Sequence, residues 1–197
     1  MPATATAATV RAHLEQHQAA AQAMAPLLAE VAAVADRVIA CYTGGGVVYT
    51  CGNGGSAADA QHFSGELIGR YRRDRRPLAA VTLTADPSVW TCIANDYSAE
   101  AVFARQVEAL AKPGDVVCGF TTSGRSPNVV AALRAAQAKG AVTVLFAGAQ
   151  AGLAGAYADH VLSAPAPTTP RVQELHTLML HMISDVVDAW AAAEKEV

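Results

Sequence analysis

The sequence of 197 residues is short of charged and aromatic side chains: 16% of its residues are charged and 6% are aromatic, while 52% are hydrophobic. It lacks the basic excess of nucleic-acid-binding proteins, because its formal net charge is −3 at pH 7, so we expect no nucleic-acid partner. It also lacks an apolar run of transmembrane length and a basic segment followed by an apolar leader. We therefore expect a soluble, cytoplasmic protein without membrane contact.

Closely spaced cysteine pairs are missing too. The four cysteines, Cys41, Cys51, Cys92 and Cys118, are scattered and form no C-x-x-C pair. Three of them lie in apolar runs typical of strands or helices. This pattern predicts buried, reduced thiols rather than disulfides or a zinc ribbon.

The chain shows neither an internal repeat nor a linker-like stretch, which predicts a single domain over residues 1–197. Residues 1–44 have the pattern of two helices broken near Pro26, whose apolar faces would pack either on the sheet or on another subunit. Strand-like runs then alternate with helical ones, and this alternation predicts an α/β fold with a parallel sheet and helices on both faces. The expected strands are 47–51, 79–83, 115–120, 141–146 and 160–163, and the expected last helix is 172–193.

A glycine-rich turn follows the first expected strand. It reads Gly52-Asn53-Gly54-Gly55-Ser56, and a helical segment starts at Ser56. Backbone N–H groups at a helix N-terminus and the helix dipole both favour a bound anion. The spacing matches neither the P-loop nor the dinucleotide-binding fingerprint.

A second turn of the same kind carries four hydroxyl groups, on Thr121, Thr122, Ser123 and Ser126. Ligands of parallel sheets bind outside the carboxyl ends of the strands, where both turns fall. Alone, the second turn is equally typical of a helix cap. Together, the two turns indicate a site for a phosphate group.

Metal-binding side chains are spaced along two of the expected helices. His62 and Glu66 share a helix face, and such a pair either binds a divalent metal or makes a surface hydrogen bond. In the last helix, Gln173, His176 and His181 interrupt an apolar run. Gly65, which costs a helix about 1 kcal/mol against alanine, suggests a close packing neighbour at that turn.

These motifs resemble those of the phosphoheptose isomerase branch of the sugar isomerase (SIS) family, over essentially the whole chain. The resemblance implies a three-layer αβα sandwich with a five-stranded parallel sheet and extra N-terminal helices. It implies one Zn²⁺ per active site with His62, Glu66, Gln173 and His181 as ligands. Glu66 and His181 would also be the catalytic acid–base pair.

We expect the substrate to be a phosphorylated sugar held by the two turns and by polar residues near them. The expected binding residues are Asn53, Gly54, Ser56, Arg70, Asn95, Asp96, Thr121, Thr122, Ser123, Ser126 and Gln173. Arg70 is included because it would lie one helical turn beyond Glu66, whereas the four arginines at positions 72, 73, 75 and 76 are expected to form a solvated turn.

The sequence departs from the family pattern at three positions. Thr121 replaces a serine of the phosphate loop and keeps its hydroxyl. Arg125 replaces an asparagine and either adds a cation near the phosphate or faces solvent. Pro170 stands where some members have aspartate, so a substrate hydrogen bond is in doubt there.

The implied reaction is the aldose–ketose isomerisation of sedoheptulose 7-phosphate to D-glycero-D-manno-heptose 7-phosphate, the first step of a heptose pathway that serves lipopolysaccharide or another product. One alternative is a non-catalytic SIS protein of the initiator-associating type. Such proteins lack the glutamate and the last histidine, which are present here as Glu66 and His181. Isomerisation of another phosphosugar is a further alternative.

The spacing of two expected ligands bears on assembly. Gln173 and His181 are eight residues apart, which on one helix separates them by about 12 Å and roughly 80°. Either the last helix starts after Gln173, or the ligands of one zinc come from different chains. We expect the second, in a homotetramer with active sites between subunits where Glu66 and His181 could meet. A core helix whose polar residues face unrelated neighbours is the alternative.

Overall fold

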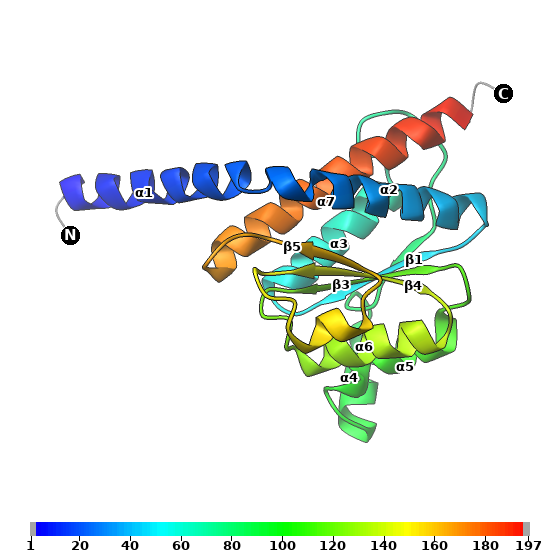
Figure 1. The fold of residues 1–197 in the computed structure, drawn as a ribbon. Helices are drawn as coiled ribbons and strands as arrows, with labels where there is room; N and C mark the ends of the chain where they lie inside the picture. The colour runs from blue at the N-terminus through cyan, green and yellow to red at the C-terminus, as the bar shows by residue number, and fades with distance from the viewer. Residues whose placement is uncertain (1–2, 195–197) are drawn as a thin grey trace.

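The computed structural model describes residues 3–194, and within them five strands form one parallel sheet between two layers of helices (Figure 1). The strand order is β2-β1-β3-β4-β5. The strands are β1 (Val48–Gly52), β2 (Ala80–Thr82), β3 (Val116–Thr121), β4 (Val142–Ala147) and β5 (His160–Ser163). The fold class expected from the sequence is confirmed.

The helices are α1 (Ala3–Gln22), α2 (Leu28–Thr43), α3 (Gly55–Ile68), α4 (Pro87–Asp96), α5 (Ala101–Leu110), α6 (Pro127–Ala138) and α7 (Thr169–Ala193), with short 3-10 segments at Ala25–Leu27 and Gly152–Tyr157. Helices α2, α3 and α7 cover one face of the sheet, and α5 and α6 cover the other (Figure 1). None of the helices within residues 3–194 combines the length and apolarity needed to cross a membrane.

Side-chain alternation along the strands builds the two cores. In β3, Cys118 and Phe120 point into the core under α2, α3 and α7, while Val117 points into the core over α5 and α6. Successive residues of a strand face opposite sides, so a strand buried on both sides is apolar throughout. Cys41, Cys51 and Cys118 are buried and all four thiols are free, which confirms the sequence prediction.

The strand order creates a switch point between β1 and β3. From β1 the chain crosses to β2 on one side, and it later returns to β3 on the other. Helices on opposite sides diverge there and leave a crevice at the carboxyl ends of the two strands. Both of the polar turns found in the sequence follow these two strands.

The two N-terminal helices behave differently from each other. Helix α2 packs on the sheet and on α7 through buried residues that include Val34 and Val38. Helix α1 projects from the body (Figure 1), and its outer residues Val10 and Leu14 are 66% and 58% exposed. The second half of α1 contacts α7: the guanidinium of Arg171 donates to the carbonyl of His13, and His17 Nδ1 lies 2.7 Å from the Glu174 carboxylate.

Two helix boundaries differ from the prediction. Helix α7 begins at Thr169 rather than at residue 172. Pro170 therefore lies in the first turn of α7 and not in the preceding loop. A proline is tolerated there because the N–H that it lacks would have no partner within the helix. From the sequence, a helix that starts at Asp86-Pro87 is expected to end near residue 93, with a break at residues 95–97. Helix α4 instead runs to Asp96, so Asn95 and Asp96 lie in its last turn.

The expectation of a solvated arginine turn is wrong for Arg75. Its side chain is 1% exposed and its Nε donates to Asp188 of α7, whose side chain is fully buried. Burial alone would raise the pKa of Asp188, but backbone N–H groups of Arg73, Arg72 and Tyr71 and the guanidinium of Arg75 hold that pKa below its usual range. The turn is thus fixed to α7 through one carboxylate.

We predict that Asp115 is more important for stability than an exposed helix cap. Its buried carboxylate accepts from the backbone of Val47, at the start of β1, and of Lys112. Replacing Asp115 with alanine leaves these two N–H groups unpaired, so the free energy of unfolding in urea should fall by about 2–3 kcal/mol.

Asp86→Ala is the control. The Asp86 side chain caps α4 by accepting from the backbone of Ser88 and Val89 at an exposed site, so its loss should cost only about 1 kcal/mol. Equal, small effects of both substitutions would contradict the importance given to Asp115.

Candidate active site

The turn after β1 is tight because its glycines allow it. A Cβ at Gly52 would lie 2.5 Å from the carbonyl oxygen of Ser56, and Gly54 has φ 55° and ψ −121°, a conformation that other residues avoid. Helix α3 therefore starts directly at the carboxyl end of β1. Its first-turn N–H groups face the crevice side of the sheet.

The turn after β3 is a compact network of hydroxyl groups. The Oγ1 of Thr121 lies 2.9 Å from the Oγ of Ser126 and 3.4 Å from that of Ser123. The Oγ of Ser123 also accepts from the backbone N–H of Arg125. Gly124 has φ 63°, and a Cβ there would meet the carbonyl oxygen of Ala151 at 2.1 Å. The loop is thus pressed against the following segment and held in one shape.

The two turns are joined to each other across the switch point. Asn53 and Asn128 exchange two amide hydrogen bonds, of 2.9 and 2.8 Å. A cavity of about 330 Å³ adjoins this pair and is lined by Asn53, Ala99, Glu100, Ser126, Pro127 and Asn128. A second cavity, of about 290 Å³, also adjoins Asn53 and is lined in part by Gly54, Thr84 and Trp90.

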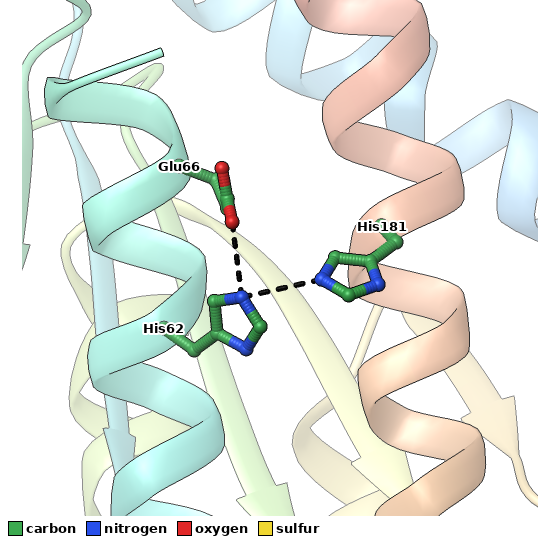
Figure 2. A group of neighbouring side chains, drawn as sticks. All are labelled: His62, Glu66 and His181. Carbon is green, nitrogen blue, oxygen red and sulfur yellow. Dashed lines mark hydrogen bonds and ion pairs between the residues drawn. The ribbon is translucent and has the colours of Figure 1, made fainter. Parts of the chain in front are cut away.

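A second polar cluster lies farther along α3, where it faces α7 (Figure 2). His62 Nε2 is 3.0 Å from Glu66 Oε1 and 3.2 Å from His181 Nε2. The three potential ligand atoms all lie within 4.8 Å of one another. Three of the four expected zinc ligands therefore meet within a single chain.

The surroundings of His181 favour its uncharged imidazole. Burial and the neighbouring His62 both lower the pKa of His181, against an opposite effect of Glu66. The ring of Tyr71 packs on that of His181, with centroids 5.5 Å apart. A neutral imidazole nitrogen and a carboxylate are ligands that a divalent metal takes in proteins.

The structure decides one of the two alternatives for Gln173. Helix α7 is continuous from Thr169, so the alternative in which the helix starts after Gln173 is wrong. The Gln173 amide lies against the N-terminus of α3, where a Cβ on Gly55 would be 2.4 Å from its Nε2. Within one chain Gln173 therefore lies beside the glycine-rich turn and away from His181, whereas Glu66 and His181 meet without a second chain.

Arg70 is also misplaced by the sequence argument. Helix α3 ends at Ile68, so Arg70 does not share a helix face with Glu66, and its guanidinium donates to the carbonyl of Arg72. Gly69 ends the helix before the expected extra turn is complete. In addition, leaving aside its chain neighbours and the adjacent backbone of α3, nothing in residues 3–194 lies within 4 Å of a Cβ placed on Gly65, so the close neighbour expected there is not among these residues.

Asn95 and Asp96 lie exposed at the end of α4. The Asn95 amide donates to Asp96, which also accepts from the thiol of Cys92. Within residues 3–194, no hydrogen bond joins either residue to the two turns or to the histidine cluster.

Arg125 is exposed beside the hydroxyl turn, and no hydrogen bond of its guanidinium is seen within the same range.

Sequence reasoning overlooked Asp59. Its buried carboxylate accepts from Thr177 of α7 at 3.0 Å, one helical turn before His62, and burial raises its pKa. The available signal was an acidic residue on the face of α3 that also carries His62 and Phe63.

Known proteins are similar to this chain over most of its length. The SIS domain model matches residues 11–148. The chain is 44% identical over 179 residues to a phosphoheptose isomerase of Roseiflexus sp. (strain RS-1), covering 91% of this chain and 89% of the relative. It is 48% identical over 162 residues to the phosphoheptose isomerase of Burkholderia pseudomallei (strain 1710b), covering 82% of each.

The chain belongs to the phosphoheptose isomerase branch of the SIS-domain family. A solved phosphoheptose isomerase from Neisseria gonorrhoeae superposes with a TM-score of 0.89 at 38% identity, covering 93% of this chain and 99% of that one. The protein is therefore an enzyme, a sugar phosphate isomerase, and the non-catalytic alternative is set aside.

We predict a pH-dependent contribution to stability from His176, which is fully buried and donates from Nε2 to the carbonyl of Ala147. Burial lowers the pKa of His176 to about 4, whereas an unfolded histidine titrates near 6.5. The contribution is complete above pH 6.5 and is lost as the pH falls toward 4. Between pH 7.5 and pH 5 the loss should be about 2 kcal/mol.

Urea unfolding at the two pH values tests this. His176→Gln keeps an N–H near the position of Nε2 but does not titrate, so its stability should fall less on acidification than that of the wild type. His13→Gln, at an exposed position of α1, should leave the acid-induced loss unchanged. Identical losses in the wild type and His176→Gln would show that the prediction is wrong.

Proposed function

We propose that this isomerase converts sedoheptulose 7-phosphate to D-glycero-D-manno-heptose 7-phosphate with one Zn²⁺ bound in each active site. The observation that carries the proposal is the convergence of His62, Glu66 and His181 from two helices. The names of the relatives support the seven-carbon substrate. The product would enter heptose synthesis in the cytoplasm, for lipopolysaccharide or another heptose-containing product.

The three residues fit a zinc ion. Bond lengths near 2.0 Å place tetrahedral ligand atoms about 3.3 Å apart. His62 Nε2 lies 3.0 Å from the Glu66 oxygen and 3.2 Å from His181 Nε2, so two of the three ligand separations are close to this value. The lowered pKa of His181 also favours the neutral form that binds metal.

Glu66 and His181 would carry out the acid–base chemistry. Isomerisation moves a proton between two adjacent carbons, one of them a carbonyl carbon, through an enediol. The Glu66 carboxylate would take this proton from one carbon and return it to the other, while the His181 imidazole exchanges protons with the substrate oxygens. A bound zinc ion would supply polarisation of the carbonyl and hydroxyl oxygens.

The two turns at the switch point would bind the phosphate. The hydroxyl groups of Thr121, Ser123 and Ser126 and the first N–H groups of α3 and α6 suit a dianion. Phosphate binding away from the reacting carbons supplies energy that positions them. Arg125, exposed at the same loop, is close enough in the chain to add a positive charge.

We further propose that complete active sites form between subunits of a homotetramer. Gln173 lies about 12 Å along α7 from His181, so a metal held by His181 cannot take Gln173 of the same chain as a ligand. A second copy could supply it. The exposed outer part of α1 and the open surface at Gly65 are available to such a neighbour.

We predict that Glu66→Gln lowers kcat by roughly 100-fold or more, because the amide keeps the shape of the side chain but cannot accept the carbon-bound proton. The assay uses zinc-loaded protein and sedoheptulose 7-phosphate. Glu30→Gln is the matched control, since Glu30 also pairs with a histidine, His160, on another part of the molecule. A kcat near the wild-type value for Glu66→Gln would refute the mechanism. Faster turnover of a shorter ketose phosphate would contradict the proposed seven-carbon substrate.

Subunit complementation tests the shared site. Gln173→Ala and Glu66→Gln proteins, each inactive alone, should regain activity when mixed under conditions of subunit exchange, because some mixed sites then carry an intact Gln173 and an intact Glu66. Combining Glu66→Gln with His181→Ala should restore none, because these two residues meet within one chain. Full activity of a monomer in solution would contradict the proposal that the active site is shared between subunits.

A further inference from the structure

The C-terminal end of α3 is held by a side chain from outside the helix. The guanidinium of Arg75 donates to the carbonyl oxygens of Glu66 at 2.6 Å, Leu67 at 2.8 Å and Gly69 at 3.2 Å. Carbonyl groups in the last turn of a helix have no partner within the helix. One of the three belongs to Glu66, so Arg75 contacts the backbone of a residue of the active-site cluster.

The same guanidinium reaches α7. Its Nε donates to Asp188 Oδ1 at 3.0 Å, and both side chains are buried. Asp188 lies seven residues, two helical turns, after His181, and so on the same face of α7. A single buried ion pair therefore joins the helix that carries His62 and Glu66 to the helix that carries His181.

Asp188 also fixes the segment that follows α3. It accepts from the backbone N–H groups of Tyr71, Arg72 and Arg73, at 3.3, 3.2 and 2.8 Å. The Tyr71 ring, held in this way, packs on His181. The imidazole is thus supported by the same carboxylate that contacts Arg75.

Apolar packing alone would leave the spacing of the two helices less well defined. Phe63 and Leu67 of α3 belong to the same core as Leu175 and Met179 of α7, and contacts of this kind are non-directional. A guanidinium has donors in a fixed planar arrangement, so it satisfies several acceptors only at one separation. Burying charge is costly unless every group is paired, and here each partner is in place.

We propose that Arg75 and Asp188 are positioning residues of the active site, which set the distance between α3 and α7 at which His62 and Glu66 meet His181. The catalytic consequence rests on the proposed zinc-dependent isomerase function. Zinc affinity and kcat depend on this spacing, whereas the KM for the phosphosugar does not, because the phosphate turns lie at the carboxyl ends of β1 and β3.

The test compares Arg75→Lys with Arg76→Lys. Lysine keeps the charge at position 75 but cannot bind the three carbonyl groups and Asp188 together. Arg76 is the adjacent arginine of the same segment and forms an exposed pair with Glu194, the residue after α7. Within residues 3–194, no hydrogen bond joins its side chain to α3. Asp188→Asn is a second variant that perturbs the pair from the side of α7.

Three quantities are measured for folded protein at a temperature well below each melting point. Competition with a chromophoric chelator gives the dissociation constant for zinc, and steady-state kinetics give kcat and KM. A metal-free measurement reports the spacing directly: spin labels at Ile68→Cys and Val186→Cys, two exposed positions of α3 and α7, in a Cys92→Ser background.

Arg75→Lys and Asp188→Asn should weaken zinc binding by about 10- to 100-fold and lower kcat by a similar factor, the usual effect of losing a residue that orients metal ligands. KM should change by less than about 2-fold, the interspin distance distribution should broaden, and Arg76→Lys should match the wild type. Unchanged zinc affinity, kcat and spin-label distances in both variants, with reduced thermal stability alone, would overturn the proposal.

The two proposals fail in different ways. If the wild type neither binds zinc nor isomerises the substrate, the proposed function is wrong. The spin-label distances then decide the spacing proposal by themselves, because they need neither metal nor turnover.

Discussion

The packing of α3 against α7 is the contact on which the cluster of His62, Glu66 and His181 depends. Neither helix alone carries His62, Glu66 and His181, so the distance and rotation between the two helices decide whether the cluster exists. Two polar contacts enclose the cluster along the helix pair. Thr177 donates to Asp59 before it, and Arg75 pairs with Asp188 beyond it. Directional contacts of this kind restrict sliding that apolar contacts permit.

A second constraint comes from the order of the strands. Parallel connections place all carboxyl ends on one edge, and the switch between β1 and β3 opens a crevice there. Both polar turns lie beside this crevice, and two hydrogen bonds between the amides of Asn53 and Asn128 connect them. In the proposed mechanism the fold separates two tasks: anion binding at the ends of the strands, and proton transfer farther along α3.

Most of the fold could be predicted from the sequence because its signals are local. The strand 160–163 has the predicted bounds, and Asp86 caps α4 as its position before proline suggests. Errors occurred where a neighbour outside the segment decides the outcome. The arginine turn has an ordinary surface composition, and Arg75 is buried because it pairs with Asp188, more than a hundred residues later, and with carbonyl groups at the end of α3. The early start of α7 was missed because Pro170 is compatible with both a loop and a first helical turn.

The sequence by itself determined the local chemistry: the glycine-rich and hydroxyl-rich turns, and the pair of His62 and Glu66 on one helix face. Each of these follows from spacing within a single element. Tertiary structure alone decided that His181 meets this pair across 119 residues of chain, while Gln173 of the same helix lies against Gly55. Periodicity shows which residues share a face of a helix, but the position of that face against a neighbouring helix depends on packing across the whole core.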